Sequence, residues 1–358
     1  MNKISGSLCA IGLLFSTYTF AELEFETYSF IDSHSYSEIA PIKQVIDGLE
    51  GDPIDSGDFA FTHNQFEVGQ RWKGFELAVF WRYDYYLEFD RDTAELVYLD
   101  KNDVAPDTGR KYDVYLKANH LKSRGIGLGY SYDFTPDLTG RLRLNYLTAS
   151  EMLDGELNGH VSTDTNTYAG NLQLDYGYSE DILLDRPKES VRGKGYSVDV
   201  DLFWQLTDQL EVAFRGRDVH SRIRWKDLTY TQATATTDRI SYDQNGNLQS
   251  IPGIRGQEGY RNHTQQLPER YWLTASHALS DRWSAGAEAF FYDEHLFPRV
   301  ILSHQRGAFS LQASYDFESE ALGIGLTHRY IQFLLRADDT DWEQARALEL
   351  LLNVSVSY

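Results

Sequence analysis

The chain has 358 residues, and its 54 acidic side chains outnumber its 33 Lys and Arg side chains, which gives a formal net charge of −21. This balance argues against a nucleic-acid-binding protein, which needs a basic face, and an aromatic content of 14% is too high for a disordered acidic tail. Beyond the N-terminus, no apolar run approaches the roughly 20 residues of a membrane-spanning helix, so an ordinary helical membrane protein is excluded.

The N-terminal segment has the layout of a secretory signal peptide. Lys3 precedes a short apolar stretch, and Ala21 supplies a small residue at the expected cleavage site. We therefore expect residues 1–21 to be a signal peptide and residues 22–358 to form the mature protein. The single cysteine, Cys9, lies too early in the apolar stretch for a lipoprotein site. The exported protein then has no disulfide and depends on backbone pairing and packing.

The mature chain alternates between apolar and polar residues. From Phe75 to Asp90, every odd position is apolar or aromatic, and five of the eight even positions are charged. Alternation over this length predicts a β-strand with one apolar face and one polar face. The same pattern recurs in segments 112–119, 126–134, 141–146, 171–176, 310–317 and 348–358.

Two architectures use such strands. A soluble sandwich turns the apolar face inward, whereas a membrane barrel turns it outward to lipid and encloses the polar face. The predicted strands are near the ~10 residues of a tilted membrane strand, whereas strands of soluble proteins average about 5–6. Aromatic residues also gather at the predicted strand ends, as the interfacial girdles of a barrel require: Trp72, Phe89, Phe134, Tyr146, Trp204, Trp225, Trp283, Phe317 and Tyr358.

The connections between strands differ in length. Short ones contain residues 73–74, 135–137, 207–209, 280–282 and 318–320, and long polar ones cover 33–57, 148–165, 226–266 and 336–344. Outer-membrane barrels have short turns on the periplasmic side and long loops on the extracellular side, whereas a sandwich has no reason to sort its loops. The connections therefore favour the barrel.

The C-terminus carries the most specific feature. The chain resembles the bacterial outer-membrane β-barrel proteins, a porin-like class in which the last strand ends on an aromatic residue with apolar residues at every second position before it. Leu352, Val354, Val356 and Tyr358 fit this pattern, with Tyr in place of the usual Phe. The resemblance implies that these residues are a signal for the barrel-assembly machinery. It also implies a location in the outer membrane of a Gram-negative bacterium, with outer-membrane lipid and lipopolysaccharide as partners.

The number of strands has two readings. Fourteen candidates lie near residues 22–32, 58–72, 75–90, 111–121, 125–134, 138–148, 166–177, 196–206, 209–225, 268–279, 283–292, 307–317, 321–334 and 345–358. The directions set by the short turns require two more strands, at 95–100 and 178–185, unless these segments belong to loops. A short helix is expected within 41–50. We thus predict an all-β, closed antiparallel transmembrane barrel of 14–16 strands.

Catalytic and metal-binding patterns are weak. Residues i and i+2 share a face of a strand, so His-x-Ser would be the simplest Ser-His pair on a barrel wall, and it does not occur. The adjacent pairs His34-Ser35, Ser276-His277 and Ser303-His304 should point to opposite faces. The other histidines lack metal-ligand spacing. We therefore expect no enzyme, no catalytic residue, no metal and no cofactor.

Charged residues lie on the polar face of the predicted strands, opposite the apolar face. The predicted lumen-lining residues are Glu76, Arg82, Asp84, Glu88, Arg141, Arg143, Glu211, Arg215, Glu288 and Arg329. Such residues hold water in a lumen and set its ion preference. Alternatively, they pair across strands and tie the wall together. The negative net charge predicts a modest preference for cations.

The leading functional hypothesis is a channel for passive passage of small hydrophilic solutes, whose identity the sequence leaves open. The alternative is a non-conducting or plugged barrel that acts as a surface-polysaccharide export port, scaffold or adhesin. The long segment 226–266, rich in Thr, Gln, Asn, Gly and Arg, motivates this alternative because it could fold into the lumen or outward. A lipid-modifying enzyme is a third and weaker hypothesis. No nucleic-acid partner is expected.

Overall fold

The structure is a computed structural model that describes residues 25–164, 167–180, 191–242 and 248–358. The predicted signal peptide, residues 1–21, lies outside the described residues. Two helices are present, α1 (Ile42–Ile46) and α2 (Arg91–Lys101). The strands are β1 (Glu26–Ser37), β2 (Phe59–Trp72), β3 (Phe75–Phe89), β4 (Lys111–Thr135), β5 (Leu138–Asp164), β6 (Thr167–Tyr178), β7 (Gly193–Gln205), β8 (Leu210–Tyr242), β9 (Leu248–Gln265), β10 (Arg270–Ala278), β11 (Trp283–Tyr292), β12 (His295–Arg306), β13 (Phe309–Asp316), β14 (Leu322–His328), β15 (Ile331–Ala337) and β16 (Ala347–Ser357).

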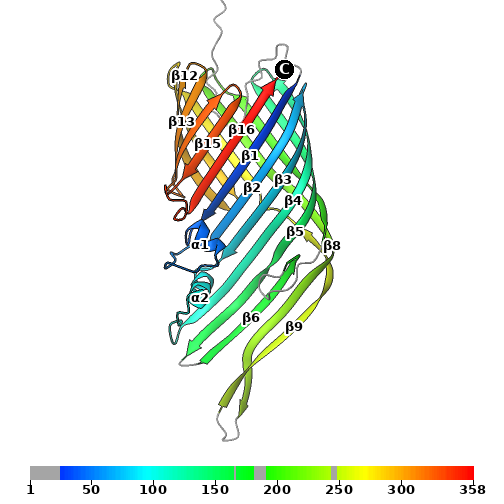
Figure 1. Cartoon of the computed structure of the whole chain (residues 1–358), viewed down its shortest axis with the longest axis vertical. Helices are drawn as coiled ribbons and strands as arrows, with labels where there is room; N and C mark the ends of the chain where they lie inside the picture. Colours follow the sequence, from blue (N-terminus) through cyan, green and yellow to red (C-terminus); the bar gives the residue numbers. More distant parts are fainter. Residues whose placement is uncertain (1–24, 165–166, 181–190, 243–247) are drawn as a thin grey trace, which may run out of the picture.

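Fourteen of these strands close an antiparallel ring (Figure 1). The ring runs from β10 through β16, then β1 to β5, β7 and β8, and β8 pairs with β10 to close it. Phe25 and Tyr358 exchange two backbone hydrogen bonds, of 3.3 and 3.0 Å, where the two ends of the chain meet. Because every strand in a closed ring is paired on both sides, the barrel has no free edge. The predicted closed barrel is confirmed.

The two additional strands, β6 and β9, extend one sector of the wall beyond the ring. The periplasmic half of β5 pairs with β7, and its outer half pairs with β6. In the same way β8 pairs with β10 near the periplasmic turns and with β9 farther out. In Figure 1 this sector, from β4 to β9, reaches far past the ends of β12 to β16.

This arrangement decides between the two predicted counts in favour of fourteen strands in the ring. The segments 166–177 and 196–206 do run in the same direction, but β6 and β7 lie end to end along β5, so no strand is needed between them at 178–185. Most of that segment lies outside the described residues. The segment 95–100 is helical and belongs to α2.

A further correction concerns β4, which joins the predicted strands 111–121 and 125–134. The sequence Ser123-Arg124-Gly125 suggests a turn, but Arg124 and Gly125 continue the pairing with Trp81 and Phe80 of β3. The ring of Phe80 occupies the space that a side chain at position 125 would need, so glycine here serves packing. With a single strand, the chain directions no longer require the strand predicted at 95–100.

Strand assignment also changes near the C-terminus. The prediction missed β12, which contains Pro298, a residue that usually disfavours a strand interior. The predicted strand 321–334 is two strands, β14 and β15, joined by a turn at residues 329–330. Residues 318–320, predicted to be a periplasmic turn, therefore connect β13 to β14 on the side of the long loops.

The outer connections pack beside the barrel mouth. The predicted helix within 41–50 is confirmed as α1, while α2 begins after Asp90, whose side chain accepts a 2.7 Å hydrogen bond from the Thr93 backbone N–H. A small apolar core lies beneath both helices: Ile39, Ala40, Leu49, Ala60, Phe89 and Ala94. The Asn102 side chain donates to the Leu49 carbonyl at 2.9 Å and so joins the two connections. Among the described residues, no helix is long and apolar enough to span a membrane.

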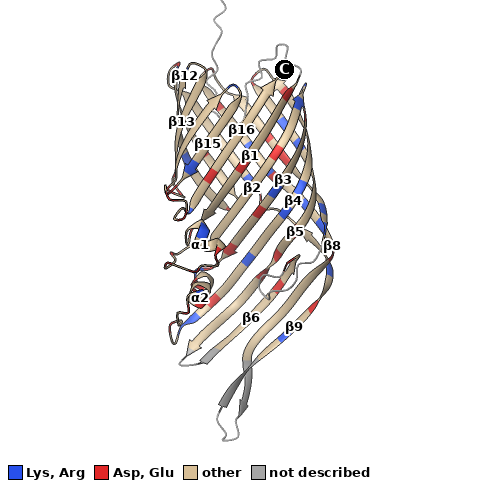
Figure 2. Cartoon of the chain, viewed as in Figure 1, with Lys and Arg blue, Asp and Glu red and all other residues tan. Residues whose placement is uncertain are grey.

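The wall is apolar outside and charged inside. Outward residues such as Leu128, Leu144 and Ile324 remain 59%, 53% and 62% exposed, whereas Glu76 and Arg299 on the inner face are buried. Figure 2 shows that charged residues occur along the strands as well as in the loops. Water would not favour such an exterior, but lipid does, because acyl chains solvate apolar side chains.

Candidate functional site in the barrel lumen

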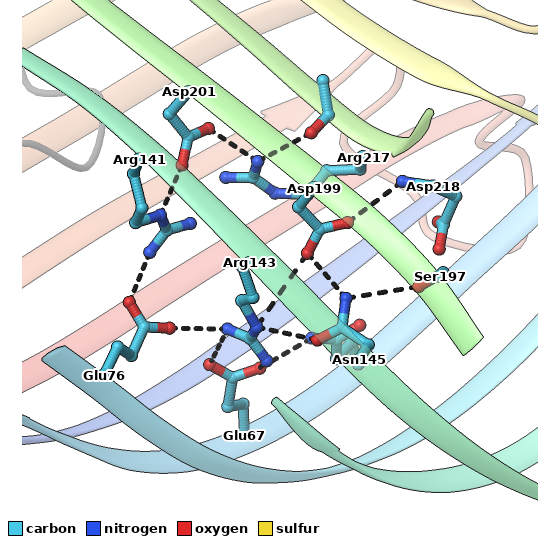
Figure 3. A network of polar contacts seen from close by, with 12 residues as sticks. Glu67, Glu76, Arg141, Arg143, Asn145, Ser197, Asp199, Asp201, Arg217 and Asp218 are labelled. Carbon is cyan, nitrogen blue, oxygen red and sulfur yellow. Dashed lines mark hydrogen bonds and ion pairs between the residues drawn. The ribbon is translucent and has the colours of Figure 1, made fainter. Parts of the chain in front are cut away.

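Charged side chains from several strands meet inside the barrel. Arg143 of β5 lies at the centre of one such group (Figure 3). Its guanidinium donates to both carboxylate oxygens of Glu67, at 2.7 and 2.8 Å, and to Glu76 at 2.8 Å. The Tyr28 hydroxyl donates to the same two carboxylates at 2.7 and 3.0 Å. All four side chains are buried, so each charge depends on these partners in place of water.

The group continues toward β7 and β8. Arg141 bridges Glu76 and Asp201, with both nitrogen–oxygen distances at 2.6 Å. Arg217 binds the other oxygen of Asp201 at 2.6 Å, as Figure 3 shows. The Asp199 carboxylate accepts from the Asn145 side chain at 2.9 Å and from the Asp218 backbone N–H at 3.0 Å.

Arg82 of β3 connects this group to a different part of the ring. It donates to its neighbour Asp84 and, at 2.8 Å, to Asp218 of β8. Arg270 of β10 also reaches Asp218, at 3.3 Å. We call the connected set the ionic cluster: Glu67, Glu76, Arg82, Asp84, Arg141, Arg143, Asp199, Asp201, Arg217, Asp218 and Arg270.

A second charged group lies under β12 to β16. Arg299 binds Asp316 at 2.6 Å, Glu288 at 3.1 Å and Glu349 at 3.3 Å. Arg336 also pairs with Glu349. These ion pairs thus tie β11, β12, β13, β15 and β16 together from within.

Aromatic side chains fill the lumen nearer to the extracellular end. We call this set the aromatic layer: Tyr36, Phe59, Phe61, Tyr86, Trp272, Phe290, Tyr292 and Phe297. Tyr36 meets Phe297 edge to face at 5.0 Å between ring centroids, and the ring of Phe61 stacks on Tyr292 at 4.0 Å. Tyr36 and Phe61 come from β1 and β2, whereas Phe297 and Tyr292 come from β12 and β11 on the other side of the ring. The walls of the barrel therefore meet at this level.

Two small spaces lie at the ionic cluster. One void of about 90 Å³ borders the cluster, and another of about 20 Å³ lies toward the aromatic layer. A single water occupies about 30 Å³ in the liquid, so these spaces suit small groups. The larger void is lined by seven arginines, Arg71, Arg82, Arg141, Arg143, Arg215, Arg217 and Arg270, and by four carboxylates, Glu67, Asp199, Asp201 and Asp218.

Arg215 differs from the other arginines of this lining. Its side chain is 8% exposed, and its guanidinium carbon lies 5.1 Å from the ring centroid of Trp272. Among the described residues, no carboxylate lies within 4.0 Å of its nitrogen atoms. Arg215 borders both voids and therefore presents a buried positive charge to each of them.

The structure brings together most of the predicted lumen residues. Glu76, Arg82, Asp84, Arg141 and Arg143 belong to the ionic cluster, Arg215 borders it, and Glu288 belongs to the second group. Glu88 lies farther out and pairs with Lys117 at 3.2 Å, and the half-buried Glu211 lies near the periplasmic end of β8. Arg329 lies outside the lumen: it occupies the exposed turn between β14 and β15, where the predicted strand breaks.

Several residues of the site were missed by the sequence analysis. Glu67 was detectable, since it alternates with the outward Phe66 and Val68. Arg299 lies in the missed strand β12. Asp218 lies where the pairing of β7 with β8 shifts register, and its backbone has a positive φ of 56°. Strict alternation along the strand would therefore place its side chain on the outer face of the wall.

A closed antiparallel ring with a lipid-compatible exterior and a charged interior defines an outer-membrane β-barrel protein, as the sequence predicts. Among the described residues, no group of three or more His, Cys, Asp or Glu side chains is placed to hold a metal ion.

No protein-family model and no curated protein matches the chain. Among solved structures, it is similar to a deletion mutant of the monoaromatic hydrocarbon channel TodX, with 12% identity, a TM-score of 0.46, and coverage of 94% of this chain and 91% of that one. The Pseudomonas putida toluene transporter TodX gives 12% identity, a TM-score of 0.43, and coverage of 94% and 89%. The Ralstonia pickettii toluene transporter TbuX gives 11% identity, a TM-score of 0.40, and coverage of 94% of this chain and 89% of that one. Likeness at this distance assigns no substrate to the chain.

Proposed function

We propose that the protein is an outer-membrane channel that is closed in this structure and admits small solutes carrying an anionic group. The observation that carries the proposal is the arginine-rich void, at which Arg215 presents a positive charge with no carboxylate within 4.0 Å among the described residues. A buried charge without a partner is costly, and an anion that enters the void would remove that cost. Arginine is well suited to this role, because its planar fork can bind both oxygens of a carboxylate or phosphate.

The closure comes from side chains of the wall. The segment 226–266, which was expected to fold either into the lumen or outward, contributes to the β8–β9 hairpin, and in Figure 1 this hairpin extends away from the ring. Opening therefore requires the rings of the aromatic layer to separate. Rotamer changes and small shifts of the opposed walls are sufficient motions for this, because the layer has no backbone pairing across the lumen.

The proposed preference for anions is opposite to the preference for cations that the net charge of the chain predicts. Much of the acidic excess lies in the outer connections: residues 38–58 contain Glu38, Asp47, Glu50, Asp52, Asp55 and Asp58 against a single Lys43. These charges are remote from the void, and salt screens exposed charges beyond about 8–10 Å. The arginines at the void therefore have more influence on ion preference than the charge of the whole chain.

The test is the reversal potential of single channels in a planar bilayer under a salt gradient. We expect anion preference in the wild-type protein and a weaker preference in Arg215→Gln. Arg282→Gln is the matched control, because it removes the same charge from an exposed periplasmic turn. Cation preference that is the same in all three proteins would contradict the proposal.

A non-conducting barrel remains the second candidate, and the contact between opposite walls at Phe61 and Tyr292 favours it. It predicts that no current steps appear in the wild-type protein or after the aromatic layer has been trimmed. In that case the ionic cluster would serve the stability of the wall alone.

The third hypothesis, a lipid-modifying enzyme, receives less support. Ser276 is buried on the inner face of β10, and the adjacent His277 is exposed on the outer face. A nucleophile and its base must lie within hydrogen-bond reach of one another. This pair does not meet that requirement.

A further inference from the structure

One sector of the outer surface is strongly basic. Its exposed side chains, which we call the basic patch, are Lys122 and Arg124 of β4, Arg192, Lys194 of β7, and Arg222 and Arg224 of β8. The concentration is unusual in a chain with a net charge of −21. Among the outward positions of β1 to β3 and β10 to β16, only Arg306, at the periplasmic end of β12, holds Lys or Arg. The patch is therefore a local feature and needs a local explanation.

The strand register aligns the patch. Arg124 pairs with Thr148, Thr148 with Lys194, and Lys194 with Arg224, so a single row crosses β4, β5, β7 and β8. Neighbouring strands are about 4.8 Å apart, which places the three basic residues within roughly 15 Å along the row. Arg222 lies two residues closer to the periplasm, beside Tyr196. The flexible side chains of this row can reach one ligand together.

The row also lies at a defined height on the wall. Toward the periplasm, the next outward residues are Ile126 on β4, Tyr146 on β5 and Tyr196 on β7, and all three are exposed. Residues 125–135 of β4 separate Arg124 from the periplasmic turn, and about 10 residues of a tilted strand cross the bilayer core. The patch thus lies where the headgroups of the outer leaflet begin. The exposed tyrosines below it match an interfacial girdle.

A surface groove adjoins the row. It has a volume of about 730 Å³ and is lined on one side by Phe66, Trp81 and Tyr83 and on the other by Lys122, Arg124 and Arg192. An apolar wall beside basic side chains matches a ligand with acyl chains at one end and a negative charge at the other.

The basic side chains have few partners in the protein. Lys122 pairs with Glu151 at 3.1 Å. Among the described residues, no carboxylate lies within 4.0 Å of the nitrogen atoms of Arg124, Arg192, Lys194, Arg222 or Arg224. Five neighbouring cations without a counter-charge repel one another, so an anionic ligand would stabilise this surface.

We propose that the basic patch binds the phosphate groups of a lipid A-type glycolipid in the outer leaflet. Arginine forms bidentate, charge-assisted hydrogen bonds with phosphate, and the row offers two arginines and one lysine at the headgroup level. The acyl chains of the same lipid would lie along the exposed apolar residues below the row. The patch would then fix one glycolipid molecule beside β4, β5, β7 and β8.

The test measures binding of diphosphorylated lipid A to the full-length mature barrel in detergent by native mass spectrometry. The variant Arg124→Gln/Lys194→Gln/Arg224→Gln removes the row. A basic residue near an anionic lipid surface contributes on the order of fivefold in affinity, so the loss of three such residues should weaken binding by on the order of a hundredfold. The control Arg282→Gln/Arg306→Gln/Arg329→Gln removes the same charge from exposed periplasmic turns and should bind as the wild type does.

Two further arms identify the ligand group. Dephosphorylated lipid A should bind the wild-type protein as weakly as the diphosphorylated lipid binds the row variant, and phosphatidylglycerol should bind less tightly than lipid A. Both variants should keep the heat-modifiable gel migration of a folded barrel. Equal lipid A affinity in the row variant and the wild type would overturn the proposal, as would equal affinity for the dephosphorylated lipid or for phosphatidylglycerol.

Discussion

The ring of Phe61 on β2 stacks on the ring of Tyr292 on β11 with 4.0 Å between their centroids, although these two strands are directly opposite one another in the fourteen-strand ring. A round barrel of this many strands would hold opposite side chains far apart, since barrel diameter grows with strand number. The wall is therefore drawn together at the aromatic layer. Any solute that crosses the lumen has to pass between these rings.

The ionic cluster should make a large contribution to stability through Arg143. We expect Arg143→Met to lower the free energy of unfolding by roughly 3–5 kcal/mol, because it leaves Glu67 buried without its main counter-charge and removes one of the arginines that pair with Glu76. Equilibrium unfolding in urea with the barrel in lipid vesicles measures the change. Lys43→Met is the control: it breaks the exposed 3.4 Å pair with Glu343 and should cost less than about 1 kcal/mol. Equal small losses in both variants would show that the cluster is not needed for stability.

The lipid-facing surface gives a second prediction. Leu144→Arg places a charge on an exposed apolar position of β5, within the part of the wall that lies below the basic patch. We expect a loss of roughly 2–4 kcal/mol in vesicles, as for a charge near the bilayer midplane.

Ile254→Arg is the matched control for this effect. Ile254 is 79% exposed, but it lies on the β9 extension beyond the ring, where water surrounds the side chain. This variant should change stability by less than about 0.5 kcal/mol. A similar loss in both variants would place the membrane boundary elsewhere on the wall.

The first outer connection should respond to pH through Glu38. Partial burial raises the pKa of Glu38 from its ordinary value of 4.5 to about 7. The Asp58 backbone N–H donates a 2.8 Å hydrogen bond to the Glu38 carboxylate, which favours the ionised form and offsets part of this rise. Because the folded pKa is raised, the protonated form stabilises the folded connection. This stabilisation is complete below about pH 4.5 and is lost as the pH rises through about 7.

Hydrogen exchange of residues 38–58 measures this effect. We expect slower exchange at pH 6 than at pH 8, after correction for the intrinsic rate, and no such difference in Glu38→Gln. The turn at residues 73–74, on the periplasmic side, supplies an internal control within the same spectra. An equal pH dependence in Glu38→Gln would assign it to another group.

Much of the fold could be predicted from local sequence, because a strand in a membrane wall must alternate at every step. Phe75–Phe89 shows this: from Phe75 to Tyr83 its odd residues face lipid and its even residues face the lumen, whereas Leu87 and Phe89 pack into the apolar core beneath the outer helices. Alternation does not determine where one strand ends and the next begins. It therefore divided β4 at Gly125, joined β14 to β15, and missed β12 with its proline.

The lumen was less predictable, for a physical reason. Local alternation gives the face on which a charge lies, but it does not give the partner across the ring. Arg143 and Glu67 are 76 residues apart in sequence, and Arg82 and Asp218 are 136 apart, so their contacts depend on the closed shape of the whole barrel. The aromatic layer also departs from the expectation that inward residues are polar, since Phe61, Phe290 and Phe297 point into the lumen and are apolar.

The conductance of single channels in a planar bilayer tests the closure of the lumen most directly. We compare the wild-type protein with Phe61→Ala/Tyr292→Ala, which removes the stacked pair, and with Phe309→Ala/Tyr132→Ala, which removes two exposed, lipid-facing rings of the same kinds. A closed channel predicts rare or small current steps in the wild type and in the lipid-facing control, and frequent, larger steps in Phe61→Ala/Tyr292→Ala. Large, sustained open conductance in the wild-type protein, unchanged by removal of the stacked pair, would contradict it.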